Sequence, residues 1–296
     1  MRSEPVWAVV VTHNRKELLI QCLEALLAQT RSADTVLVVD NASTDGTAAL
    51  VRERFPRVRL LPLPVNEQCA GGFHEGLRTA HEGGAEWIWL LDDDAVPLPE
   101  ALAGLLAPLE DLGALPEPLL LAGRVVWDDG QLHPMNAPGF RRQGVDEVIG
   151  ASDHGLMPIR SASFVSLCVN RAVLDRFGLP HKHFVIYGDD TEWTARILRA
   201  GSGYMVPGSI VHHRTKAPAT AISSAASRFY YHVRNTVYML RGTAWTGTEK
   251  LSLVWVLLAS SAAHLRGSPG RTESLLAIGR GVRDGLRRPA VEVQGA

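Results

Sequence analysis

Along the first part of the chain, short apolar runs alternate with longer segments in which apolar residues recur at helical spacing. The short runs show no polar alternation, which is typical of strands buried on both faces of a parallel sheet. The pattern predicts strands at 6–12, 35–40, 58–63 and 86–91 and helices at 16–29, 41–55 and 73–81. Ser43 or Thr44 is the expected N-cap of the second helix. We therefore predict an α/β fold in which helices sandwich a mostly parallel sheet.

Beyond about residue 112 the pattern loosens, because proline and glycine become frequent. It still predicts strands at 119–126 and 204–211, helices at 171–177 and 191–200, and a long loop at 128–156. Loops of that length are usually functional or mobile. The tail has a helical pattern that breaks at GSPG. We expect two regions, with the sheet in residues 1–220 and a C-terminal helical extension in residues 221–296.

The composition is that of a folded protein, with 46% hydrophobic residues, 21% charged residues and a net charge of -1. The charge is uneven, because residues 214–296 carry 12 Lys and Arg against 4 Asp and Glu, which leaves the rest acidic. Three cysteines without CxxC spacing argue against a disulfide framework or a zinc site. The first apolar run is too short for a signal peptide, so we expect a cytoplasmic protein. An acidic body and the lack of a recognition motif argue against nucleic-acid binding.

Three consecutive acids, Asp92, Asp93 and Asp94, follow a predicted strand in the segment WIWLLDDDAVP. Ligands of open parallel sheets bind at the carboxyl ends of the strands, so this cluster is expected to face the ligand crevice. Residues i and i+2 of an extended segment share a side, so Asp92 and Asp94 converge while Asp93 points away. Two convergent carboxylates need a cation, and oxygen ligands suit Mg²⁺ or Mn²⁺ that bridges substrate phosphates. The alternative is an acidic loop that caps the following helix.

Two further loops lie where the predicted sheet binds its ligand. Asp40 closes the strand at 35–40, where it either accepts a hydrogen bond from a ring or sugar donor or caps the next helix. Gly71 and Gly72 in NEQCAGGFHEG either let a ligand approach the start of a helix or mark a plain helix entry. The chain has no GxGxxG or GK[ST] pattern in this loop, which argues against a dinucleotide fingerprint or a P-loop.

Acids and histidines also lie at element ends in the second half of the chain. In YGDDTEW we interpret Asp189 as a helix N-cap and Asp190 as a catalytic residue. His212 and His213 end the strand predicted near 204–211. A lone histidine is usually structural, but a histidine at a strand end near a carboxylate pair is also a candidate metal ligand.

Taken in order, several motifs resemble the family 2 glycosyltransferases of GT-A fold, especially bacterial galactofuranosyl- and rhamnosyltransferases. The motifs are VVVTHNR, VVDNASTDGT, NEQCAGGFHEGLRTA, WIWLLDDDA, YGDDTEWTARILRAG and PGSIVHH, and the resemblance covers roughly residues 6–240. It implies that residues 1–220 form a nucleotide-sugar-binding and catalytic domain. It also implies inverting transfer of a sugar from a UDP- or dTDP-sugar to a glycan or polyprenyl-linked acceptor in cell-surface polysaccharide synthesis.

The resemblance also implies roles for individual residues. Asp92 and Asp94 would hold Mn²⁺ or Mg²⁺ on the donor diphosphate, with His213 as the third protein ligand and His212 as its competitor. Asp190 matches the general base, although the family often has Glu-Asp where this chain has Asp-Asp. The residues implied to bind the donor nucleotide are Thr12, Asp40, Asn66, Gly72 and Asp93. The chemistry agrees, since a leaving diphosphate needs charge neutralisation and the incoming hydroxyl must lose a proton.

Two other functions would use the same pocket. A nucleotidyl- or phosphotransferase would also use a metal at the paired acids, but it would release pyrophosphate instead of a nucleoside diphosphate. A non-catalytic scaffold that binds sugar nucleotides is the third interpretation. The presence of both metal-ligating acids, the histidine and the candidate base argues against it.

The predicted helical tail has two features of its own. RFYYHVRNTVYMLR interleaves aromatic residues and arginines, and Arg234 either meets donor phosphate or acceptor or lies on a solvated helix face. The apolar run at 251–263 has only 13 residues, too few to span a bilayer. Its basic flanks predict that residues 250–288 contact an anionic membrane surface, which would place the protein peripherally on the inner face of the cell membrane. A packing helix or a homo-oligomer interface is the alternative.

Overall fold

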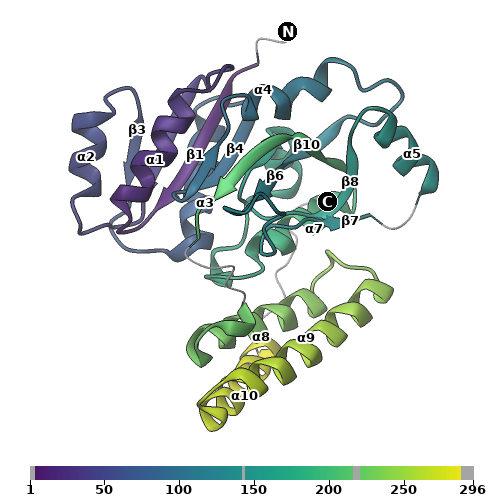
Figure 1. Cartoon of the computed structure of the whole chain (residues 1–296). Coiled ribbons are helices and arrows are strands. Elements are labelled where there is room, and N and C mark those ends of the chain that lie inside the picture. The colour runs from purple at the N-terminus through teal and green to yellow at the C-terminus, as the bar shows by residue number, and fades with distance from the viewer. Residues whose placement is uncertain (1–3, 142–143, 216–220, 288–296) are drawn as a thin grey trace.

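The computed structural model of the chain describes residues 4–141, 144–215 and 221–287. Figure 1 shows a central sheet covered by helices, with the C-terminal helices gathered in a layer at the bottom of the view. This arrangement confirms the predicted α/β fold and the C-terminal helical extension.

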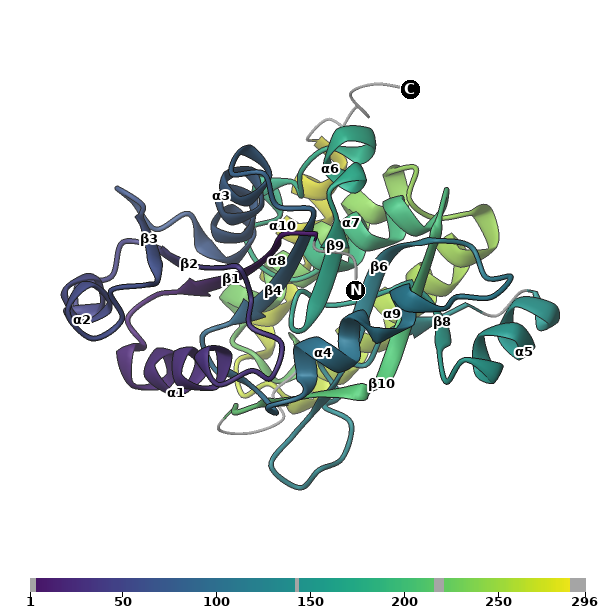
Figure 2. The same ribbon diagram turned by 90° about the horizontal axis from the view of Figure 1, so that it is seen from above.

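The N-terminal half of the sheet is parallel, as the buried apolar strands predict. Its strands are β1 (Val6–Thr12), β2 (Thr35–Asp40), β3 (Arg59–Pro62) and β4 (Trp87–Asp92), in the spatial order β3-β2-β1-β4. The helices between them are α1 (Lys16–Leu27), α2 (Thr47–Arg54) and α3 (Gln68–Glu82). Figure 2 shows α1 and α3 on opposite sides of these strands. Alternate β1 residues therefore face different cores, with Ala8 and Val10 in one and Trp7 and Val9 in the other.

The C-terminal half of the sheet contains both parallel and antiparallel pairs. Its strands are β5 (Ala95–Pro97), β6 (Pro118–Val126), β7 (Gly139–Phe140), β8 (Met157–Ser161), β9 (Leu167–Asn170) and β10 (Ser202–His213). The sheet continues from β4 in the order β9-β6-β10-β8-β7, and β5 pairs with the end of β10. It becomes mixed because β9 lies antiparallel between β4 and β6. The flanking helices and turns are α4 (Ala101–Leu106), η1 (Ala107–Glu110), α5 (Val145–Asp153), α6 (Ala172–Phe177), η2 (Lys182–Phe184) and α7 (Asp189–Leu198).

The prediction that Ser43 or Thr44 caps the second helix is wrong. α2 begins at Thr47, and its N-cap is Gly46, whose φ is 90°. Ser43 and Thr44 instead bond to Asn14 in the loop after β1. The Asn14 N–H donates to Ser43 Oγ (2.9 Å), and the Thr44 N–H donates to Asn14 Oδ1 (2.7 Å). These polar side chains therefore join two loops at the carboxyl edge of the sheet.

The largest of the other differences concern the start of α3 and the predicted long loop. α3 begins at Gln68 and not near residue 73, so Gly71 and Gly72 lie inside the helix. The predicted loop at 128–156 contains β7 and α5 within its described part. Both elements are short and lie at the edge of the fold, where the apolar pattern that marks buried elements is weak.

The C-terminal extension contains η3 (Ala221–Ser223), α8 (Ala226–Arg241), α9 (Gly247–Gly267) and α10 (Arg271–Arg287). The predicted break at GSPG separates α9 from α10. Helices α8 and α10 pack closely through glycines. A Cβ added at Gly281 would lie 2.9 Å from Val233 Cβ, and one at Gly285 would lie 2.6 Å from Val237 Cβ.

Helix α9 is tied to the sheet at its first turn. Thr246 and Glu249 form a capping box, and Arg160 Nε of β8 donates to Glu249 Oε1 at 2.7 Å. These contacts fix the start of the helix against the body of the protein. Within the ranges that the structure describes, no helix combines the length and the apolar character needed to cross a membrane.

Helix α3 packs so closely on the sheet that Gly76 has no room for a side chain. A Cβ there would lie 2.5 Å from Val9 Cγ1 and 3.1 Å from Val39 Cγ2. We expect Gly76→Ala to lower the free energy of unfolding by about 1–3 kcal/mol, because this overlap outweighs a helix-propensity gain of at most about 1 kcal/mol. Urea denaturation measures the change. Gly279→Ala on α10, with no atom within 4 Å of the added Cβ, is the matched control and should not destabilise. Equal losses in both variants would contradict the packing argument.

Candidate active site

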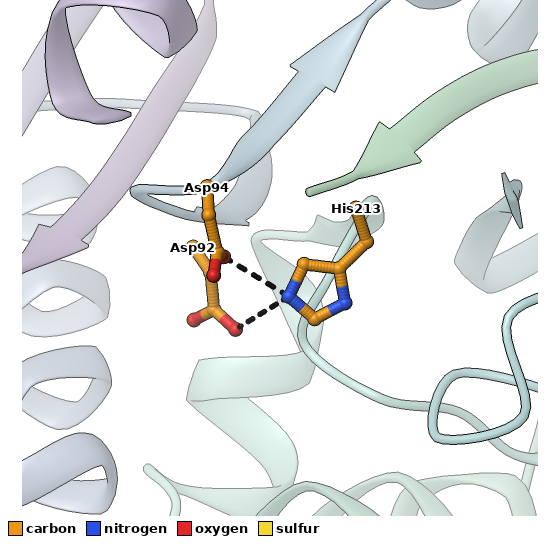
Figure 3. A group of neighbouring side chains, drawn as sticks. All are labelled: Asp92, Asp94 and His213. Atoms are coloured by element: carbon orange, nitrogen blue, oxygen red, sulfur yellow. Dashed lines mark ion pairs between the residues drawn. The ribbon is translucent and has the colours of Figure 1, made fainter. Parts of the chain in front are cut away.

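Strand pairing brings three polar side chains together at the carboxyl edge of the sheet. Asp92 is the last residue of β4, and Asp94 follows in the turn before β5. β5 pairs antiparallel with the end of β10, which sets Ala95 opposite His213 and places the imidazole beside both carboxylates (Figure 3). His213 Nε2 lies 3.0 Å from Asp94 Oδ1 and 3.9 Å from Asp92 Oδ2. His212 is the adjacent residue of the strand, so its side chain points to the other face.

Hydrogen bonds fix the orientation of the His213 ring. Its Nδ1 lies 2.7 Å from Asn136 Oδ1, and Asn136 Nδ2 donates to Ser163 Oγ at 2.9 Å. Because the amide oxygen can only accept, Nδ1 of His213 carries the proton. The Nε2 lone pair of the neutral ring then points at the carboxylates. Lone pairs and carboxylates that face one another repel unless a proton or a metal ion lies between them.

The group of Asp92, Asp94 and His213 fits a divalent metal ion. One atom from each residue can be chosen so that all three lie within 4.8 Å of one another. Asp94 Oδ1 is buried and accepts no hydrogen bond from the described residues, although it lies 3.0 Å from His213 Nε2. A buried carboxylate oxygen without a donor is costly. A cation bound by these three side chains would satisfy it with ligand types that suit Mg²⁺ or Mn²⁺.

Asp93 turns away from this group and toward the end of β1. Thr12 Oγ1 donates to Asp93 Oδ2 at 2.8 Å. Arg15 Nη1 donates to Asp93 Oδ1 at 3.2 Å and to Asp94 Oδ2 at 2.9 Å. Neither Arg15 nor Asn136 was predicted from the sequence to belong to the site. The sequence does contain a signal for Arg15. It is a cation that follows the first strand in VVVTHNR, and the end of that strand lies beside the three acids.

Burial and mutual repulsion shift the pKa values of the acids. Burial, followed by the charge of Asp94, raises the pKa of Asp92 to about 7, and burial raises the pKa of Asp93 to about 6. Burial alone would raise the pKa of Asp94, but contact with His213 and the charge of Arg15 lower it below its usual value. Burial alone would lower the pKa of His213, but Asp94 and Asp92 raise it. Without a metal ion, Asp92 therefore tends to keep its proton up to a pH of about 7, and His213 keeps its proton to a higher pH than an ordinary imidazole.

Asp189 and Asp190 lie in the first turn of α7. The N-cap is Gly188, with φ 82°, so the prediction that Asp189 caps the helix is wrong. Asp189 is buried, and its Oδ2 has no hydrogen-bond partner among the described residues. Burial and the charge of Asp190 raise the pKa of Asp189, and the charge of Asp92 adds to the effect. Asp190 Oδ1 accepts from the Thr191 N–H at 2.6 Å, and burial raises the pKa of Asp190.

The other residues predicted to bind the nucleotide have structural contacts at or near the same edge. Asp40 is buried at the end of β2, and its Oδ1 accepts from the Ser43 N–H at 3.0 Å. Asn66 Oδ1 accepts from a backbone N–H at the start of α3 at 2.8 Å. Gly72 lies against β1, where an added Cβ would come within 2.5 Å of Val11 Cγ1. These contacts account for the residue types locally, and the nucleotide-binding roles stay predictions.

Comparison with known proteins places the chain in a family. The model of glycosyl transferase family 2 matches residues 7–116. Galactofuranosyltransferase GlfT1 of Mycolicibacterium smegmatis is 31% identical over 204 residues, which cover 67% of this chain and 67% of that protein. The chain belongs to glycosyl transferase family 2. It is accordingly a glycosyltransferase, and the resemblance noted in its motifs is confirmed.

Two further comparisons of this family 2 glycosyltransferase cover more of the chain. An N-acetylglucosaminyl-diphospho-decaprenol L-rhamnosyltransferase of Mycobacterium tuberculosis is 26% identical over 283 residues, 87% of this chain and 91% of that protein. The crystal structure of S. aureus TarS 1-349 in complex with UDP-GlcNAc matches with a TM-score of 0.62 and 16% identity. That match covers 94% of this chain and 81% of the TarS chain. The similarity confirms the GT-A fold.

A divalent cation should bind more tightly as the pH rises from about 6 to about 8. Asp92 and His213 must release protons before their ligand atoms are free, so the metal competes with protons. We expect Mn²⁺ to raise the melting temperature more at the higher pH. His213→Ala should remove most of this increase, whereas the neighbouring control His212→Ala should keep it. An increase that is independent of pH, or equal losses in the two variants, would contradict the site.

Proposed function

We propose that this family 2 glycosyltransferase is inverting and metal-dependent. It would move a sugar from a UDP- or dTDP-sugar to a hydroxyl of a lipid-linked glycan in cell-surface polysaccharide synthesis. The observation that carries this proposal is the convergence of Asp92, Asp94 and His213. The acids that open α7 lie near this group, since the charge of Asp92 contributes to the raised pKa of Asp189. The first group can hold a metal on a diphosphate, and the second can accept a proton.

The leaving diphosphate needs positive charge around it. Asp92, Asp94 and His213 would hold Mn²⁺ or Mg²⁺, which when bound neutralises charge on the departing phosphates. Arg15 supplies a second cation, since 53% of its side-chain surface is exposed while its Nη1 stays on Asp93 and Asp94. The exposed part of a guanidinium held in this way is suited to bind a phosphate oxygen.

Asp190 is the proposed general base. As the acceptor oxygen bonds to the anomeric carbon, the bond from that carbon to the diphosphate oxygen breaks, and the hydroxyl proton moves to the Asp190 carboxylate. Attack from the side opposite the leaving group inverts the anomeric centre. The raised pKa supports this role, because a base is most effective when its pKa approaches the working pH.

The donor nucleotide is proposed to lie along the carboxyl ends of β1 and β2. Thr12 and Asp40 end these two strands, and Asn66 and Gly72 lie at the start of α3, which begins beyond β3. Ligands of α/β sheets bind at this edge, which supports Thr12 and Asp40 as contacts of the base and ribose. Asp93 would act indirectly, because it holds both Thr12 and Arg15.

The names of the relatives support the proposed substrates. One relative is named a galactofuranosyltransferase, and the other is named for a diphospho-decaprenol acceptor that receives rhamnose. The second match covers 87% of this chain and so includes part of the helical extension. We therefore propose a polyprenyl-linked acceptor and assign residues 1–220 to donor binding and catalysis.

Asp190→Asn should lower kcat by about 10²–10⁴-fold, because it removes the base without changing the shape of the side chain. Metal-dependent binding of UDP or dTDP should be unaffected. The measurement is release of nucleoside diphosphate in the presence of a polyprenyl-linked acceptor, and release of pyrophosphate would instead indicate a nucleotidyltransferase. Asp175→Asn, which changes an exposed acid on α6, is the control and should keep full activity. Retained turnover in Asp190→Asn would refute the base assignment.

We also propose that α9 and α10 hold the enzyme at an anionic membrane surface. α9 exposes large apolar side chains at i, i+4 and i+7, namely Leu251 (71% exposed), Trp255 (71%) and Leu258 (65%). α10 exposes Leu275 and Leu276 in the same way. Exposed arginines accompany these side chains, namely Arg266, Arg271, Arg280 and Arg287. Exposed apolar groups next to cations are typical of helices that lie in a membrane interface. The last residue of the predicted contact, 288, lies outside the described residues.

Trp255→Gln should weaken binding to vesicles that contain phosphatidylglycerol by about tenfold or more, because a large apolar side chain no longer enters the interface. Sedimentation with vesicles measures the binding, and added salt or zwitterionic lipid should also weaken it. Val145→Gln, at an exposed apolar residue of α5, is the control and should bind as before. A dimer that Trp255→Gln dissociates, without any vesicle binding, would assign this face to a second copy of the chain.

A further inference from the structure

The segment between η2 and α7 has an unusual backbone directly before Asp189 and Asp190. Val185, Tyr187 and Gly188 have φ values of 69°, 67° and 82°. Glycine enters this left-handed region freely, whereas a β-branched valine is an outlier there. Strained residues keep such conformations only where the surrounding structure holds them, and they concentrate at functional sites.

Asn235 of α8 holds this segment by donating hydrogen bonds to backbone carbonyl groups at residues 184, 186 and 187. Its side chain is buried, and Nδ2 lies 2.9 Å from Phe184 O, 2.9 Å from Ile186 O and 2.7 Å from Tyr187 O. An amide nitrogen has two hydrogens, so the three carbonyls share them. The carbonyls of this short stretch therefore converge on one donor, which explains how the strained conformation is maintained.

Arg234 fixes the direction of the Asn235 amide. Its Nε and Nη2 donate to Asn235 Oδ1 at 3.0 and 2.9 Å, and a guanidinium cannot accept, so the amide nitrogen must face the segment. Arg234 Nη2 also donates to His183 O and Phe184 O at 2.6 and 2.9 Å. The guanidinium lies 4.8 Å from the ring centroid of Tyr231 and is 3% exposed. The solvated helix face considered for Arg234 from the sequence is therefore wrong.

The same segment and the preceding η2 also contact α3 and the residue before it, near the proposed donor pocket. The Ala70 N–H donates to Val185 O at 3.3 Å. Lys182 Nζ lies 2.6 Å from Glu67 Oε2 and 2.5 Å from Glu75 Oε1. The segment that leads to Asp190 is therefore held from two sides, by α3 and by α8.

We propose that Asn235, oriented by Arg234, is a positioning residue that keeps Asp190 aligned with the acceptor hydroxyl. This inference rests on the proposed role of Asp190 as general base. Without the amide, the carbonyls of 184, 186 and 187 lose their shared donor, and the strained residues relax toward ordinary φ values. The first turn of α7 follows directly, so the carboxylate moves with them. A displacement of about 1 Å in a reacting group is enough to lower a rate by about 100-fold.

The test compares Asn235→Ala with Thr236→Ala in the full chain. Thr236 is the matched control, because it is the next residue of α8 and is equally buried, and among the described residues its hydroxyl donates only within its helix, to His232 O. We expect Asn235→Ala to lower kcat by about 100-fold with little change in the KM for the nucleotide sugar or in metal-dependent binding of nucleoside diphosphate. Thr236→Ala should keep a kcat near that of the unchanged enzyme.

A double-mutant cycle separates positioning from general damage to the fold. If Asn235 acts through Asp190, Asn235→Ala causes no further loss in the Asp190→Asn background. Additive losses, or an unchanged kcat in folded Asn235→Ala, overturn the inference. Retained turnover in Asp190→Asn alone overturns the base assignment, and it is recognised before Asn235 is changed.

Arg234→Lys provides a second route if Asn235→Ala does not fold. Lysine keeps a cation beside the tyrosine rings but cannot make both guanidinium bonds to the Asn235 amide. A lower kcat with unchanged donor affinity, again without effect in the Asp190→Asn background, supports the inference. An unchanged kcat in folded Arg234→Lys refutes the orienting role of Arg234.

Discussion

Repulsion among Asp92, Asp93 and Asp94 is the constraint on which the active-site edge depends. Three consecutive carboxylates at the end of a buried strand cannot all ionise without nearby cations. The fold supplies Arg15 from the loop after β1 and His213 from the end of β10. The first depends on the parallel pairing of β1 with β4 and the second on the antiparallel pairing of β5 with β10. The pairing of these strands therefore sets the electrostatics of the site.

The sequence predicts what local patterns encode and misses what distant segments contribute. The strands that end at Thr12 and Asp40 were predicted to the residue, because buried parallel strands are continuous apolar runs with polar ends. The direction of β9 was not predicted, because a buried run reads the same in either direction. Asn136 could not be found, since it comes from an irregular loop and acts on a histidine 77 residues away. Ser43 and Thr44 failed as N-caps for the same reason, because Asn14 of another loop competes for them.

Helix α8 shows that the boundary predicted near residue 220 from the helical pattern of the tail separates residues that contact one another. Its alternation of aromatics and arginines reads as an amphipathic surface helix. In the structure, Arg234 and Asn235 donate to backbone carbonyls of the body. The pattern of apolar residues cannot predict such contacts, because every residue has the same backbone groups. α8 contacts the body of the protein through these hydrogen bonds, while α9 and α10 pack against α8 and expose leucines. The proposed membrane contact and the proposed base are therefore linked through one helix.

The uneven charge of the chain gives these proposals a common physical basis. An acidic body repels both an anionic nucleotide sugar and an anionic membrane, so each must bind where the protein carries local positive charge. At the sheet edge, Arg15 and a metal held by Asp92, Asp94 and His213 would provide positive charge for the diphosphate. On the extension, the arginines of α9 and α10 would provide positive charge for the lipid surface. A membrane-bound acceptor would then approach from the side of α8, the helix that holds the segment carrying Asp190.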